Sequence, residues 1–203
     1  MKPSATPATS ARYQPSSTYI NDDFYEWLNA VSADLNQAAI RTDAPVAIQA
    51  ELARLVTIES RLLDQHAFDA WLGLMSAECA YWIPPTQPAP DLRESISLEF
   101  HDRRRLLDRI TRLRTGLAFS QMPQSRTSRL FSGLEIWPSP GRDDEWRARC
   151  NFVISESRAG HSRSLGGWSG FVFRREAGEM KIVLKQINLL DGDYPQGNNS
   201  FFL

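Results

Sequence analysis

The sequence predicts an α+β fold in which N-terminal helices pack on a curved antiparallel or mixed sheet. Two observations carry this prediction. Apolar residues repeat every three or four positions from residue 21 to about residue 115, which is the period of an amphipathic helix. From Leu130 to Leu190 the repeat shortens to two, which is typical of half-buried strands. Helices followed by a run of strands favour the α+β class, and a curved sheet wrapping the helices is the simplest cover for their apolar stripes.

The first half of the chain predicts four helices. Asn21-Asp22-Asp23 is an N-cap signal for a helix that ends near Ile40, and Asp43 with Pro45 restarts the chain. A short third helix is expected over Phe68 to Met75, and a fourth between a cap at Asp102 and a stop at Gly116. The stripe of the second helix contains one acidic residue and consists of Ile48, Leu52, Leu55, Val56, Glu59, Leu62 and Leu63.

Strands are expected mainly in the second half. The segment Cys79 to Ile83 is rich in aromatic residues and ends at a Pro-Pro pair, so it predicts an early strand, followed by a loop over residues 87–97. Glu176-Ala-Gly-Glu179 is a hairpin signal between two later strands. The later strands are expected over Leu130–Ile136, Trp146–Ile154, Trp168–Phe173 and Met180–Leu190. Glycines at 166, 167 and 170 indicate a bend or a close backbone contact.

Composition excludes several function classes. A net charge of −1 argues against a general nucleic-acid binder, and the absence of a run of 18 apolar residues argues against a transmembrane helix. The polar N-terminus does not resemble a secretory signal, so free thiols in the cytoplasm are expected. The only candidate soft ligands are Cys79, Cys150, His66, His101 and His161. No cysteine has a histidine nearby in sequence, so a Rieske cluster is not expected. The three histidines lie in distant segments, so a two-His, one-carboxylate iron site is not expected either.

Two features remain to be explained by function. The first is a basic run, in which arginines outnumber Asp102 and Asp108; it comprises Arg103, Arg104, Arg105, Arg109, Arg112, Arg114, Arg126 and Arg129. Three readings are open. The run is a solvated or internally paired helix face, a nucleic-acid surface, which the near-neutral total charge disfavours, or an interface, since the planar guanidinium pairs bidentately and stacks. The second is the apolar tail Phe201-Phe202-Leu203. Chain ends are usually polar, so this tail either closes the core or meets a partner subunit.

Several stretches in order make the chain similar to a known family. They include Glu59-Ser-Arg-Leu-Leu-Asp64, Trp71-Leu-Gly-Leu74, Tyr81-Trp-Ile-Pro84, Asp102-Arg-Arg, Thr115-Gly-Leu-Ala118, Ser125-Arg-Thr127, Leu189-Leu-Asp191 and Asn199-Ser-Phe-Phe-Leu203. From about Leu52 to Leu203 the chain resembles the β (small) subunit of Rieske-type aromatic-ring-hydroxylating dioxygenases.

The resemblance implies a cone-like fold of the nuclear transport factor 2 and ketosteroid isomerase type. The expected organisation is a disordered or extended segment over residues 1–20, an additional helix within 21–44 and a cone-fold domain over 45–203. The resemblance also implies a hexamer of three α and three β subunits. In such a hexamer the α subunit holds the Rieske [2Fe-2S] cluster and a mononuclear iron, and electrons come from NAD(P)H through a reductase or ferredoxin.

Three functional hypotheses follow. The first is a non-catalytic structural subunit without catalytic, cofactor or metal residues, whose subunit interface includes Arg103, Arg109, Arg112, Arg126, Arg129, Phe201 and Phe202. The second is a stand-alone isomerase or dehydratase of the same fold, which would need a buried acid or base among Asp64, Tyr81, His101 and Asp102. A cone filled by Trp, Phe and Leu would count against it. The third is a binding or transport module without chemistry.

Overall fold

The computed structural model describes residues 17–116, 118–197 and 199–203, so the expectation for residues 1–16 lies outside the described residues. Its helices are α1 (Asp22–Leu35), α2 (Val46–Asp64), α3 (Phe68–Leu74), α4 (Arg103–Arg114) and the 3₁₀ turn η1 (Phe119–Gln121). Its strands are β1 (Met75–Ile83), β2 (Glu99–Asp102), β3 (Arg126–Pro138), β4 (Glu145–Arg158), β5 (His161–Glu176) and β6 (Glu179–Leu189). The predicted α+β class is confirmed.

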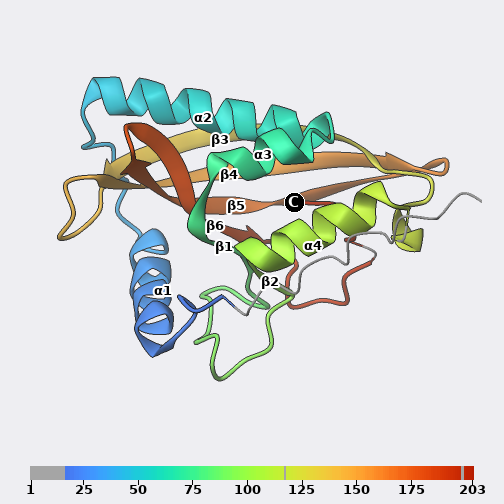
Figure 1. Cartoon of the computed structure of the whole chain (residues 1–203), viewed down its shortest axis with the longest axis horizontal. Helices are drawn as coiled ribbons and strands as arrows, with labels where there is room; N and C mark the ends of the chain where they lie inside the picture. Colours follow the sequence, from blue (N-terminus) through green and yellow to red (C-terminus); the bar gives the residue numbers. More distant parts are fainter. Residues whose placement is uncertain (1–16, 117, 198) are drawn as a thin grey trace, which may run out of the picture.

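The strands form one mixed sheet in the order β2-β1-β6-β5-β4-β3. Strands β1 and β6 are parallel, and the other neighbouring pairs are antiparallel. Helices α2, α3 and α4 lie over one face of this sheet, whereas α1 stands apart from them near one end (Figure 1). The C-terminus lies in the middle of the molecule, between α3 and α4 (Figure 1).

Two apolar cores follow from this arrangement. The larger one includes residues from α2, α3 and α4, the sheet and the tail, among them Leu52, Trp71, Leu106, Phe171 and Phe202. The smaller one packs α1 against the other face of the sheet through Leu28, Val31 and Leu35. A Cβ at Gly170 would come within 2.7 Å of a Leu35 methyl group, and one at Gly167 within 2.1 Å of the Asn188 carbonyl oxygen. These strand glycines therefore serve the expected close contacts.

The helix boundaries agree with most sequence signals. The Asn21 side chain accepts a hydrogen bond from the Phe24 amide at 2.9 Å, and Asp102 accepts one from the Arg105 amide at 2.7 Å, so both predicted N-caps are confirmed. Gly116, with a φ of +70°, follows α4 as expected. However, α1 ends at Leu35 rather than near Ile40. Ile40 is 81% exposed, so beyond Leu35 a longer helix has no apolar surface to bury.

Part of the sheet was not predicted from the sequence. Strand β1 begins at Met75, four residues before the expected start at Cys79, and the four-residue strand β2 pairs with it. Strand β2 is short and mixes charged and aromatic residues, so it shows no clear alternation. The hairpin turn at Ala177-Gly178 is confirmed, with φ values of +49° and +86°. A second Ala-Gly turn of the same kind, at residues 159–160, joins β4 to β5 and was not predicted.

Strand β3 changes face in the middle. Leu130 was expected to alternate in step with Ile136, yet Leu130 is 70% exposed and Ile136 is buried. The register against β4 shifts between Ser132 and Glu135, where Gly133 has a φ of +61°. This is a β-bulge, and its extra residue moves the following side chains to the opposite face.

Candidate cone site and candidate subunit interface

A buried ion pair lies at the centre of the cone. Helix α2 carries Glu59 on its inner face, and β6 carries Lys185 facing it; Lys185 Nζ lies 2.7 Å from Glu59 Oε1. The indole Nε1 of Trp71 donates to the same oxygen at 2.8 Å, and Lys185 Nζ also donates to the Leu203 main-chain oxygen at 2.9 Å. Burial lowers the pKa of Lys185, and the Glu59 carboxylate opposes that shift. The pair is thus satisfied by partners within the chain.

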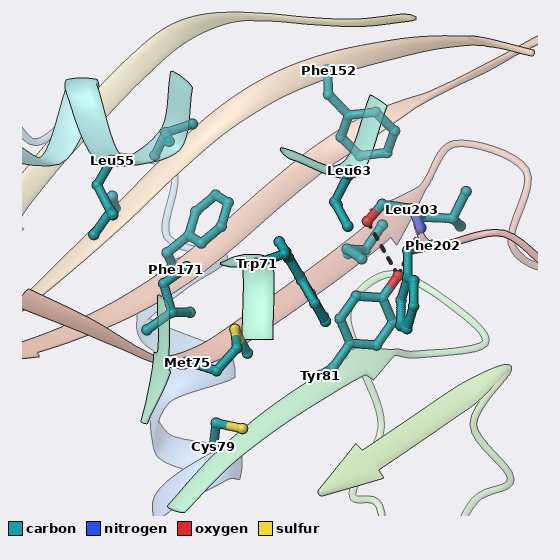
Figure 2. Packing of buried hydrophobic residues seen from close by; sticks show 14 of the residues in the cluster. Leu55, Leu63, Trp71, Met75, Cys79, Tyr81, Phe152, Phe171, Phe202 and Leu203 are labelled. Carbon is teal, nitrogen blue, oxygen red and sulfur yellow. Dashed lines mark hydrogen bonds between the residues drawn. The ribbon is translucent and has the colours of Figure 1, made fainter. Parts of the chain in front are cut away.

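Tyr81 fixes the C-terminal residues in the cone. Its hydroxyl accepts a hydrogen bond from the Leu203 amide at 2.9 Å and donates to the Leu203 oxygen at 3.2 Å, as Figure 2 shows. Burial raises the pKa of Tyr81, and the nearby Glu99 carboxylate adds to this effect. The hydroxyl therefore stays protonated and acts as a clamp on the backbone.

Phe202 fills the space between the helices and β1. Its ring centroid lies 4.8 Å from that of Trp71, 5.5 Å from Phe68 and 5.8 Å from Tyr81. Figure 2 shows the rings of Trp71, Tyr81 and Phe202 side by side, with the Leu203 backbone next to the Tyr81 hydroxyl. The Arg109 guanidinium carbon stands 4.3 Å from the Phe202 ring. Phe201, Phe202 and Leu203 are all buried, so the tail closes the chain's own core.

The cone interior has almost no free volume. One cavity of about 20 Å³ lies beside Glu59, Lys185 and Leu203, and a second of about 10 Å³ lies beside Phe201 and Phe202. Such a volume holds about one water molecule. In the described part of the cone, no open polar pocket surrounds the buried ion pair.

The four acid–base candidates serve structural contacts or lie outside the cone. Asp64 accepts from the Arg129 amide at 2.9 Å and from Thr127 at 2.8 Å, and it pairs with the Arg129 guanidinium. Asp102 caps α4, and Tyr81 holds the tail. His101 and Asp102 both border an open space outside the cone, where His101 Nε2 lies 3.3 Å from Arg109 Nη1 and 3.6 Å from a Glu99 oxygen.

Three of the arginines proposed for an interface point inward. Arg103 donates to the carbonyls of Leu72, Met75 and Ser76 at 3.0 to 3.1 Å, next to the end of α3. Arg109 pairs with Glu99 and donates to the Phe201 carbonyl at 2.9 Å. Arg129 bonds the Phe202 carbonyl as well as Asp64. These side chains hold the tail and the cone wall in place.

Arg112 and Arg126 are exposed and so remain candidates for an interface. Arg126 borders a serine-rich depression at the ends of β3, β4 and β5. Arg112 borders an open groove of about 1010 Å³ between α4, β2 and the segments that flank them. We call this space the α4 groove; its charged lining residues are Glu99, Asp102, Arg104, Arg105, Arg109 and Arg112, together with His101.

The described residues contain no group of three or more His, Cys, Asp or Glu side chains that could hold a metal ion. His66 lies in the turn between α2 and α3, His101 in β2 and His161 in β5, so the three histidines stand in separate parts of the fold. Burial raises the pKa of both Cys79 and Cys150 to about 12, so these thiols stay protonated. Within the same residues, no helix is both long and apolar enough to span a membrane.

A family model described as "Ring hydroxylating beta subunit" matches residues 58–193. The chain belongs to the ring-hydroxylating β-subunit family. It is 30% identical over 158 residues to the small oxygenase component of the p-cumate 2,3-dioxygenase system of Pseudomonas putida, covering 76% of this chain and 87% of the relative. The predicted resemblance is confirmed.

Two solved structures show which known fold this β subunit shares. The crystal structure of the β subunit of benzoate 1,2-dioxygenase from Burkholderia mallei is similar with a TM-score of 0.59 and 29% identity, covering 79% of this chain and 99% of that one. An NTF2-like protein with a cystatin-like fold from Novosphingobium aromaticivorans has a TM-score of 0.51 at 17% identity, covering 71% and 82% of the two chains. The expected cone fold is therefore confirmed.

The buried ion pair between Glu59 and Lys185 was not predicted from the sequence. Glu59 stood in the predicted apolar stripe of α2, and Lys185 stood inside the apolar run from Met180 to Leu190. The signal in the sequence was a charged residue at an inward position of α2 and another at an inward position of β6. Two such residues of opposite sign predict a buried pair, but only the fold shows that α2 and β6 face each other.

Proposed function

We propose that this chain is the non-catalytic structural β subunit of a ring-hydroxylating dioxygenase in the cytoplasm. In this proposal the α subunit holds the Rieske [2Fe-2S] cluster and a mononuclear iron and adds O₂ to an aromatic substrate. Electrons come from NAD(P)H through a reductase or ferredoxin. The β subunit supports the assembly of three α and three β subunits.

The observation that carries the proposal is the filled cone. Its interior is occupied by the chain's own Phe201, Phe202 and Leu203, and the cavities beside the ion pair and beside Phe202 measure about 20 and 10 Å³. Its titratable groups, Lys185, Glu59 and Tyr81, bond to each other, to Trp71 or to the tail. A stand-alone isomerase or dehydratase needs room for a substrate beside such a group, so the filled interior favours a structural role.

The test is co-expression with the α subunit of the same oxygenase. We expect a complex with equal numbers of the two chains and a mass that fits three of each. Iron is expected in the complex and not in the isolated β chain. Benzoate and p-cumate are the first substrates to test, because relatives are named for them. A β chain that stays separate from α, or that turns over a substrate alone, contradicts the proposal.

The proposed interface residues divide into two groups. Arg112 and Arg126 are exposed, so they are proposed to contact other subunits directly. Arg103, Arg109, Arg129, Phe201 and Phe202 are proposed to act through the shape of the β subunit, because their contacts are internal. Arg126→Ala is expected to weaken the hexamer in size-exclusion chromatography without changing the melting temperature of the isolated chain.

A further inference from the structure

The α4 groove carries more positive charge than its own acidic residues can balance. Its lining includes Arg104, Arg105, Arg109 and Arg112. The acidic lining residues are already engaged: Glu99 pairs with the buried Arg109, and Asp102 caps α4. The guanidinium groups of the other three arginines therefore face the groove without a matching carboxylate on its lining.

The contacts of these three arginines are weak. Among the described residues, the Arg105 guanidinium reaches only the Phe100 carbonyl, at 3.3 Å. Arg104 approaches Asp108 at 3.6 Å, and its buried Nε has no hydrogen-bond partner. The side chain of Arg112 has no hydrogen bond or ion pair within the described residues. Such side chains are available to an incoming anionic group.

The position of the arginines on α4 adds to the positive potential. Arg104 and Arg105 lie in the first turn of α4, where the helix dipole is positive and favours acidic residues. Beside them, the Nδ1 atom of His101 is buried without a partner and belongs to the same lining. The positive charges of the arginines and of the helix end repel one another. A negatively charged partner segment would offset that repulsion.

Apolar side chains stand exposed around the groove. Phe119 is 77% exposed and Leu98 is 39% exposed, and both line it. Ile96, between the lining residues Ser95 and Ser97, is 91% exposed. Arginine together with aromatic and aliphatic groups is the composition of a protein interface, whereas a small anion needs no apolar rim.

The charge of the groove selects its occupant. Residues 1–16 of this chain contain Lys2 and Arg12 and no acidic residue, so that segment does not complement it. A second copy has exposed acids on α1 to offer to the groove, namely Asp22, Asp23 and Glu26. However, Tyr25 of the same helix lines the groove, so this approach brings the second set of arginines close as well.

We propose that the α4 groove binds an acidic segment of the α subunit, with an apolar side chain of that segment seated against Phe119. This inference rests on the proposed function.

The experiment compares two charge reversals of equal size. Arg105→Glu/Arg112→Glu alters the groove, and Arg54→Glu/Arg61→Glu is the matched control on α2. Each pair is exposed, lies on one helix and is spaced seven residues apart. The affinity of each β chain for the α subunit is measured with purified subunits, and the melting temperature of each β chain is recorded.

We expect the groove variant to bind the α subunit about tenfold more weakly or worse, and the control to bind within about threefold of the unaltered chain. The affinity of the unaltered chain should also fall with added salt, since the contact is between charges partly open to solvent. A groove variant that binds α like the control, while the unaltered chain assembles, overturns this inference and leaves the proposed function standing. If the unaltered chain does not bind α, the proposed function itself fails.

Two further outcomes also count against the inference. A groove variant that loses self-association of the isolated β chain, but not affinity for α, assigns the groove to a second copy. Equal loss of affinity in both variants shows a general effect of net charge. If the melting temperature of the groove variant is close to that of the control variant, its weaker binding to the α subunit is not caused by a folding defect.

Discussion

The cone interior and the α4 groove both contain cationic side chains, but they use them in opposite ways. In the interior, Lys185 pairs with Glu59 at 2.7 Å, and the cavity beside this pair has a volume of about 20 Å³. In the groove, Arg105 and Arg112 are exposed beside about 1010 Å³ of open space. Helix α4 contributes to both regions, because Arg109 on the same helix is buried against Phe202. Residue type alone therefore does not tell a structural arginine from a binding arginine; its partners do.

The largest effect is expected from Phe202→Ala, which would empty part of the interior. Phe202 is 1% exposed, and truncating a buried Phe costs about 3 to 5 kcal/mol. The loss of stacking with Arg109 should bring the value toward the upper end. Urea denaturation measures the change, with Phe119→Ala, at a 77% exposed site, as the control. Benzene should raise the melting temperature of Phe202→Ala only, because an apolar cavity can bind it.

If Phe202→Ala and Phe119→Ala lower the free energy of unfolding equally, the interior is not closely packed around Phe202. Binding of benzene by the unaltered chain would point the same way, since it requires an existing cavity. Such binding would favour the hypothesis of a stand-alone enzyme with the same fold.

A comparable or slightly smaller effect is expected from Lys185→Met. Removing one partner of a buried ion pair leaves the other charge unpaired and costs about 3 to 5 kcal/mol. Lys185 and Glu59 side chains are 4% and 2% exposed, so solvent screens the remaining carboxylate poorly. The double variant Glu59→Gln/Lys185→Met should recover much of the loss in chemical denaturation. A single variant as stable as the double would show that the pair is not coupled.

These two regions also show what the sequence could predict. Local signals located the N-caps at Asn21 and Asp102 and the turn at Ala177-Gly178, because each depends on residues adjacent in the chain. The exposure of Leu130 depends on a bulge at Gly133 in the pairing of β3 with β4. The partners of Arg109 and Arg129 include Phe201 and Phe202, about 90 and 73 residues away, so their inward orientation required the fold. The α4 groove likewise joins segments that no local pattern connects.

A smaller effect concerns pH and the two buried thiols. The pKa of Cys79 and of Cys150 rises from 9.0 to about 12 on folding, because burial disfavours the thiolate. The unfolded chain therefore loses these protons first, and their contribution to stability is complete below pH 9 and falls as the pH rises toward 12. Each thiol should lower the free energy of unfolding by about 1 kcal/mol between about pH 9 and pH 10. The slope should be shallower in Cys79→Ala/Cys150→Ala, and equal slopes would contradict the burial of the thiols.

The smallest effect is expected in the groove, and it separates the two regions most directly. Arg105→Ala and Arg112→Ala should each change the free energy of unfolding by less than about 0.5 kcal/mol, because exposed charges contribute little to folding. Arg105→Ala should be neutral or slightly stabilising, since it removes a cation from the positive end of α4. Arg109→Ala on the same helix should destabilise clearly more, because it leaves Glu99 and the Phe201 carbonyl without their donor. Thermal denaturation of the three variants side by side gives the ranking. If Arg105 or Arg112 proves as important for folding as Arg109, the groove arginines belong to the structure of the β chain, and the distinction between interior and groove is lost.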